Sequence, residues 1–188
     1  FGLVEFDQAR QNSALKYFRR SLKIKEELED QRRIAATLNN CALVYKNQGD
    51  YQLAFETMGK ALNIYQEIDA QKEISDVYYN MGNNIINFKK DSKKAMNYFQ
   101  KALDIKDKLG ENKGIATCLY AIAELSYLDG CENVSLSDLE RCLEIHRKLG
   151  NADRILEVLA LHLIIQQGIG ANIRENRKEI ETMMNEEV

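Results

Sequence analysis

The sequence contains no proline and no tryptophan among its 188 residues. Proline ends or kinks an α-helix because it lacks a backbone N–H and its ring clashes with the preceding turn, so its absence favours long, uninterrupted helices. Uncharged apolar runs are short as well. The longest, residues 158–170, includes one His and two Gln and falls well below the roughly 20 residues that a membrane span needs. We therefore expect no membrane insertion within this chain.

The chain also lacks an excess of charge of either sign. Lys and Arg total 26 against 29 Asp and Glu, which gives a formal net charge of −3, while 45% of the residues are hydrophobic. That composition excludes wholesale disorder, and the length suits one domain. Because nucleic-acid binding requires a basic stripe and none is present, we expect no nucleic-acid partner.

The four cysteines show no metal-binding or redox spacing. No Cys-x-x-Cys pair occurs, and Cys41, Cys118 and Cys142 lie inside apolar helical patterns, whereas Cys131 does not. A free cysteine in such a pattern behaves as a small hydrophobic residue. Because disulfides persist mainly in oxidising compartments, the sequence predicts a cytoplasmic protein.

Residues for catalysis are scarce too. There are only two histidines, and neither His146 nor His162 has a metal-ligand companion three or four residues away. We expect His146 to be exposed near a helix end and His162 to pack in the core. No phosphate loop, dinucleotide fingerprint, nucleophile elbow or Cys-His pairing is present. We therefore predict no enzymatic activity, no cofactor and no metal.

What the sequence does contain is a repeat of about 40 residues. Leu22, Leu62, Leu103 and Leu143 follow one another at steps of 40, 41 and 40, each within an apolar pattern of helical spacing. A second helical pattern precedes each of the last three copies and begins at Ile34, Ile74 and Ile115, and another begins at Ile155. No stretch alternates as a strand would, so the fold class is predicted to be all-α.

Turn signals separate these helices. Gly49 ends one helix and Asp50 caps the next, Asp91-Ser92 does the same one residue late, and Ser137 with Glu140 has the form of a capping box. Small residues recur where two helices approach closely, at Ala42, Gly82 and Ala123. Phe1-Gly2 is in phase with Cys41-Ala42, which indicates that the first copy has lost most of its first helix and that the chain is part of a longer protein.

The pattern Leu38-Asn39-Asn40-Cys41-Ala42-x-x-Tyr45, followed by Gly49-Asp50-Tyr51-x-x-Ala54, resembles the tetratricopeptide repeat, in the longer version found in kinesin light chains and bacterial signalling proteins. The resemblance implies an α-α superhelix, a solenoid of antiparallel helix pairs. We expect a single solenoid domain over residues 1–188. Its predicted parts are a partial repeat (1–30), three repeats (31–70, 71–110, 111–150) and a degenerate or capping repeat (151–188).

The resemblance implies that the first helix of each pair lines a concave groove. On the flank of each such helix that borders the core, helical spacing places amides, tyrosines and a few charges where a fully solvated face would carry mostly Lys and Glu. The expected peptide-binding residues are Asn39, Asn40, Lys46, Asp76, Tyr79, Asn80, Asn83, Asn87, Tyr120, Glu124, Tyr127 and Glu157. Related repeats use such asparagines to hold a peptide backbone, which the resemblance implies for Asn40 and Asn80. Packing between neighbouring helices is the alternative role for Asn39 and Asn40.

These observations predict a protein–protein interaction module that binds a peptide segment in its groove. Because acidic residues outnumber basic ones on the predicted groove flank, we expect a neutral or basic segment. The alternative is the sensory or regulatory module of a larger bacterial signalling protein, such as a sensor kinase or a transcriptional regulator. Homo-association through the solenoid ends is also open, since an incomplete first pair is expected to leave Leu15, Phe18 and Leu22 partly uncovered.

Overall fold

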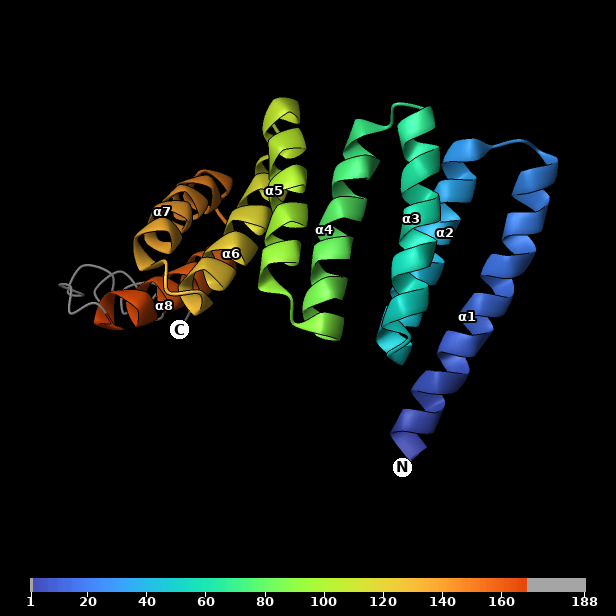
Figure 1. Cartoon of the computed structure of the whole chain (residues 1–188), viewed down its shortest axis with the longest axis horizontal. Helices are drawn as coiled ribbons and strands as arrows, with labels where there is room; N and C mark the ends of the chain where they lie inside the picture. Colours follow the sequence, from blue (N-terminus) through green and yellow to red (C-terminus); the bar gives the residue numbers. More distant parts are fainter. Residues whose placement is uncertain (1, 169–188) are drawn as a thin grey trace. The chain divides into compact units, whose positions relative to one another are not determined.

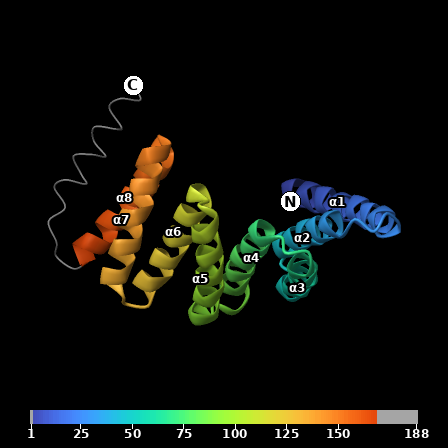
Figure 2. The same cartoon turned by 90° about the horizontal axis from the view of Figure 1, so that it is seen from above.

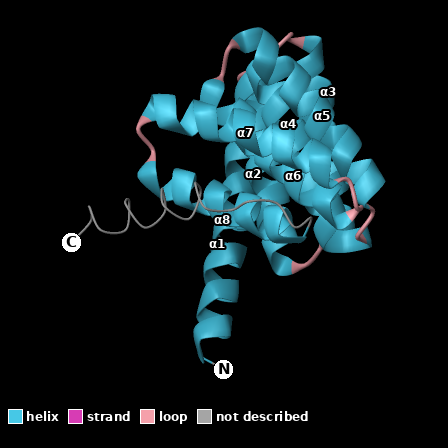
Figure 3. Cartoon of the chain, turned by 90° about the vertical axis from the view of Figure 1, so that its left-hand side faces the viewer, coloured by secondary structure: helices cyan, strands magenta, loops and turns pink. Residues whose placement is uncertain are grey.

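The computed structural model describes residues 2–168, which form helices joined by short turns and contain no strand (Figure 3). This confirms the predicted all-α class. No helix in this part of the chain is both long and apolar enough to cross a bilayer. The helices are α1 (Gly2–Glu27), α2 (Gln31–Gln48), α3 (Tyr51–Glu67), α4 (Gln71–Lys89), α5 (Ser92–Leu109), α6 (Asn112–Leu128), α7 (Glu132–Leu149) and α8 (Ala152–Gly168).

The chain divides into two compact units between Ile105 and Lys106, inside α5. In the first unit, α2 packs on α1 and on α3, and α3 packs on α4, with the chain reversing direction at each turn (Figures 1 and 2). In the second unit, α7 packs on α6 and on α8, and α6 also contacts α8. The described residues stop within the predicted terminal repeat, so its part beyond residue 168 lies outside them.

Every turn between two helices contains one residue with a left-handed backbone, which lets the chain reverse within two or three residues. The seven residues are Glu29, Gly49, Asp69, Lys90, Gly110, Gly130 and Gly150. At the turn before α5 the Asp91 carboxylate accepts a hydrogen bond of 3.0 Å from the Lys94 backbone N–H. Asp91 therefore caps α5. The 41-residue step of the repeat arises in α4, which has 19 residues where α2 has 18.

The first helix is longer than the others. Residues 2–27 form the single helix α1, with no break between the end of one helix and the start of the next. At the position where the following copy has Gly49, this copy has Ala9. Alanine is the best helix former, so nothing stops the helix there.

The expected capping box at Ser137 and Glu140 is also wrong. Helix α7 begins at Glu132, directly after the left-handed Gly130, so Ser137 lies inside the helix rather than at its start. Cys131 occupies the N-cap position of α7, six residues before Ser137.

The apolar periodicity of the sequence did not predict one buried position, which lies near the end of the second helix of a repeat. Tyr65, Lys106 and His146 occupy it in three successive copies, and all are buried. Each backbone carbonyl there accepts a hydrogen bond from the backbone N–H of the residue just after the left-handed one, a bond that closes the end of the helix. The expectation that His146 is exposed is therefore wrong.

Lys106 is the unusual member of this set. Its side chain is only 5% exposed, and its Nζ lies 3.1 Å from Glu111 Oε2. The stem runs over Gly114, where an added Cβ would lie 2.5 Å from Lys106 Cδ. A buried ammonium group needs such a carboxylate, because an unpaired charge is costly away from water.

The amino-terminal end is covered in part. Phe18 and Leu22 are half-buried, as expected, whereas Leu15 is buried. Among the side chains of α1 whose burial is described, those of residues 9–27, Tyr17 and Ile24 are the exposed large apolar ones.

Candidate functional site

The predicted binding residues lie on four helices, two in each unit. The first-unit face, on α2 and α4, comprises Asn39, Asn40, Lys46, Asp76, Tyr79, Asn80, Asn83 and Asn87. The second-unit face, on α6 and α8, comprises Tyr120, Glu124, Tyr127 and Glu157. An ion pair of 3.0 Å between Arg32 Nε and Glu73 Oε1 joins the starts of α2 and α4.

Tyr79 is held in place by the core beneath it. Its ring centroid lies 5.3 Å from that of Phe99, which is 2% exposed. Phe99 in turn lies against Gly82, where an added Cβ would be only 2.6 Å from Phe99 Cε1. Tyr79 itself is half-buried. One side of the phenol therefore packs on the core while part of the side chain stays accessible, an arrangement that suits a binding residue.

The asparagines of the first-unit face fall into two groups. Asn83 Nδ2 donates a hydrogen bond of 3.2 Å to the Tyr79 carbonyl oxygen of its own helix. The side chains of Asn40, Asn80 and Asn87 form no hydrogen bond with any described residue, and Asn40 and Asn87 are exposed. Their amides therefore keep both donors and acceptors for another chain.

Asn39 and the unpredicted Asn84 are more enclosed. Asn39 is half-buried, and its Oδ1 is buried without a hydrogen-bond partner among the described residues. Asn84 is fully buried, and its Nδ2 donates a hydrogen bond of 2.9 Å to the Tyr51 carbonyl oxygen at the start of α3. Asn84 thus connects α4 to α3. Its place three residues after Met81, on the core side of the helix, was the signal in the sequence.

Lys46 and Asp76 complete the first-unit face, and both side chains are half-buried. Lys46 lies in the last turn of α2, and Asp76 lies in the second turn of α4. The positive and the negative charge of this pair therefore lie on different helices of the face.

The second-unit face is acidic around a half-buried tyrosine. Burial raises the pKa of the Tyr120 phenol, and the carboxylates of Glu157 and Glu124 raise it further. Glu157, on α8, forms an ion pair with Arg154 of the same helix. Tyr127 is half-buried on α6, one residue after the buried Ser126. A partner group next to Tyr120 therefore meets negative potential.

The two histidines are buried in the second unit. Burial is the main cause that lowers the pKa of both, with Arg154 lowering it further at His146 and Arg147 at His162. Glu140 and a hydrogen bond with Gln166 act in the opposite direction on His162. The Nδ1 atom of His146 is buried without a hydrogen-bond partner among the described residues.

We expect the second unit to lose stability as the pH falls below about 6.5. Because the folded pKa values are lowered, the unfolded chain binds these protons first, so the stabilising contribution is present above the unfolded pKa of about 6.5 and is lost progressively below it. Urea denaturation at pH 7.5 and 5.5 measures the change. A double His146→Gln/His162→Gln variant is the control, and it should show a shallower decline. An equal decline in the variant would contradict this assignment.

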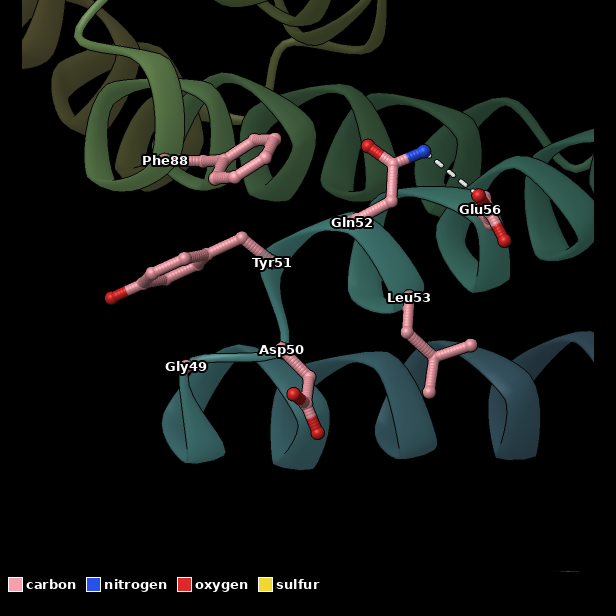
Figure 4. Close-up of a pocket in the computed structure, with 7 residues that line it drawn as sticks. All are labelled: Gly49, Asp50, Tyr51, Gln52, Leu53, Glu56 and Phe88. Carbon is pink, nitrogen blue, oxygen red and sulfur yellow. Dashed lines mark hydrogen bonds between the residues drawn. The ribbon is translucent and has the colours of Figure 1, made fainter.

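A shallow pocket of about 420 Å³ lies beside the turn between α2 and α3, and none of the predicted residues lines it. The rings of Tyr51 and Phe88 approach to 5.9 Å there. The lining side chains point in different directions and do not converge on one point (Figure 4). The lining residues are Gly49, Asp50, Tyr51, Gln52, Leu53, Glu56 and Phe88. Over the described residues, no group of three or more His, Cys, Asp or Glu is placed to hold a metal ion.

Comparison with solved structures shows the same fold in several proteins. BtubC from P. vanneervenii is 17% identical with a TM-score of 0.77, over 96% of this chain and 72% of that one. The apo form of RapI is 17% identical with a TM-score of 0.85, over 98% and 52%. Kinesin light chain repeats from Podospora anserina are 13% identical with a TM-score of 0.74, over 96% and 89%. This chain therefore spans about half the length of RapI.

The sequence comparison identifies the family. No curated protein matches the sequence. Residues 1–67 and 75–109 match two models of the tetratricopeptide repeat, and these ranges together cover more than half of the chain. The predicted resemblance is confirmed, as is the predicted class of solenoid built from antiparallel helix pairs. The chain belongs to the tetratricopeptide repeat family.

Proposed function

We propose that the chain is a protein–protein interaction module that binds an extended peptide segment of a partner protein. The observation that carries this proposal is the first-unit face. There, a half-exposed Tyr79 supported by Phe99 lies on the same helix as Asn80 and Asn87, whose amides have no hydrogen-bond partner among the described residues. Aromatic anchors next to amides that can pair with any peptide backbone are typical of binding surfaces. Membership of the tetratricopeptide repeat family supports the same role.

The charges of the two faces favour a neutral or basic segment. On the second-unit face, Glu124 is exposed and the carboxylates of Glu124 and Glu157 act on Tyr120. Lys46 is the one basic residue among the twelve predicted binding residues, so these two faces have no lysine cluster to hold a carboxylate. A cationic side chain of the partner would be attracted to Tyr120, both by its carboxylate neighbours and by its ring.

Isothermal titration with pools of basic, neutral and acidic twelve-residue peptides tests this proposal. We expect the basic and neutral pools to bind these faces, and we expect binding of the basic pool to weaken as salt is raised, because surface charges are screened. Binding of the acidic pool that is lost in a Tyr79→Ala/Tyr120→Ala variant would contradict the charge assignment. No binding by any pool would contradict the peptide-binding function.

A second candidate function is that of a sensory or regulatory module in a larger bacterial signalling protein. It is favoured by the similarity to a Rap protein solved in complex with competence and sporulation factor, which is 18% identical with a TM-score of 0.72 over 98% of this chain and 52% of that one. The gene sequence around these repeats distinguishes the two functions. A kinase or DNA-binding segment next to them favours the regulatory module.

Neither function assigns a catalytic residue, a cofactor or a metal to this chain. None of the four cysteines forms a disulfide, and Cys41, Cys118 and Cys142 are buried. We infer a reducing compartment such as the cytoplasm, because disulfides persist mainly in oxidising ones.

A further inference from the structure

The first unit has another surface, which shares no residue with the first-unit face. Three aromatic rings from three helices meet there: Phe55 of α3, Tyr78 of α4 and Tyr98 of α5. The ring centroids of Phe55 and Tyr98 are 6.0 Å apart, and those of Tyr78 and Tyr98 are 6.1 Å apart. All three rings are half-buried and pack against the core of the unit. We call these rings, with Lys94 and Lys101, the aromatic–lysine face.

Both lysines of α5 lie over these rings. Lys94 Nζ is 5.4 Å from the Phe55 ring centroid. Lys101 Nζ is 5.6 Å from the Tyr78 centroid and 5.7 Å from the Tyr98 centroid. At such distances the ring quadrupole attracts an ammonium group. Two positive charges therefore lie over one aromatic cluster.

The two lysines of this face are not held in ion pairs. Neither Lys94 nor Lys101 forms an ion pair with a carboxylate in the described part of the chain, and both are exposed. The carboxylates of Asp104 and Glu56 accept hydrogen bonds of 2.8 Å from Gln100 and Gln52. The Asp91 carboxylate accepts one of 3.0 Å from the Lys94 backbone N–H, not from its ammonium group.

We propose that the aromatic–lysine face binds an acidic peptide segment of a partner protein. Carboxylates of the segment pair with Lys94 and Lys101, and its apolar side chains rest on Phe55, Tyr78 and Tyr98. The alternative is a purely structural role, in which the lysine stems cover the apolar rings. Such a role would be compatible with ion pairs at the ammonium groups, but here the ammonium groups have no carboxylate partner among the described residues. A nucleic acid fits less well, because two lysines on a chain of net charge −3 give little attraction for a long polyanion.

A fluorescein-labelled twelve-residue peptide, made of three repeats of Glu-Leu-Glu-Tyr, tests the proposal by fluorescence anisotropy. We expect wild-type protein to bind it, and a double Lys94→Glu/Lys101→Glu variant to bind about tenfold more weakly, since two attractive charges become repulsive. A Lys94→Arg/Lys101→Arg variant should retain the affinity. The matched control is Lys23→Glu/Lys72→Glu, which makes the same change in net charge at two exposed lysines on α1 and α4 and should bind as wild type does.

The proposal would be overturned by no binding to wild-type protein, by an equal loss in the control variant, or by tighter binding of a twelve-nucleotide oligothymidylate at the same lysines. The outcome is separate from that of the proposed groove function. The Tyr79→Ala/Tyr120→Ala variant keeps the aromatic–lysine face intact and should bind this acidic peptide normally. If that variant loses the acidic peptide while the lysine variant keeps it, the peptide binds elsewhere and the assignment to this face is wrong.

Discussion

Replacing Gly82 by leucine should destabilise the protein by about 3 kcal/mol, the upper part of the range for overpacking a core. Even a Cβ at position 82 would lie 2.6 Å from Phe99 Cε1 and 2.8 Å from Phe99 Cδ1. The Phe99 ring is 2% exposed and carries Tyr79 on another side, so it cannot move aside without disturbing the core. The free energy of unfolding from urea denaturation, followed by circular dichroism, measures the effect.

Gly59 supplies the control for this experiment. It lies inside α3, and an added Cβ there would meet no atom within 4 Å. Gly59→Ala should therefore raise the free energy of unfolding by roughly 0.5–1 kcal/mol, the usual gain from alanine in a helix. Gly82→Ala should lower it, and adding Phe99→Leu to Gly82→Ala should recover part of that loss. Equal responses at positions 59 and 82 would show that the contact with Phe99 does not limit the packing.

Replacing Tyr79 and Tyr120 together by alanine should abolish binding of a neutral or basic peptide partner. Truncation of a central aromatic residue typically costs about 2 kcal/mol of binding free energy, or roughly 30-fold in affinity. The two losses together should bring binding below detection. Tyr79→Ala should also cost about 1 kcal/mol of stability, because the Tyr79–Phe99 ring pair is lost.

The phenylalanine variants separate the ring from the hydroxyl group. Tyr79→Phe and Tyr120→Phe keep the apolar ring area, so they should retain most of the affinity if packing on the partner dominates. Single variants show whether one unit or both contribute. Titration calorimetry with the basic peptide pool provides the measurement. Unchanged affinity in the double alanine variant, with the fold intact by circular dichroism, would show that these faces are not the binding surface.

Much of the helical organisation could be predicted from the order of residues. The recurring leucines and the glycines at the turns indicated where most helices lie, and Asp91-Ser92 indicated the start of α5. The prediction was wrong where it rested on a single local sequence signal. Ser137 resembled a helix start although it lies inside α7, and Ala9, where the next copy has a turn glycine, lies inside α1.

The candidate site was less predictable than the helices. Helical spacing placed Tyr79 on a flank that is half-exposed in the structure, but nothing in the sequence showed that its ring rests on Phe99. The same spacing did not separate Asn40, which is exposed, from Asn39, whose Oδ1 is buried. These differences depend on which neighbouring helix covers each side chain, and a single-helix pattern does not contain that information.

The sequence by itself determined the repeat, the all-α class and the family, because these follow from the periodicity of apolar residues and from turn glycines, which act within one or two helices. Only the tertiary structure decided that Lys106 and His146 are buried, that Gly82 makes room for Phe99, and that Lys94 and Lys101 lie over rings from three helices. Each of these depends on contacts between segments that packing brings together. Such contacts depend on the shapes of both segments, and a local sequence pattern describes only one of the two.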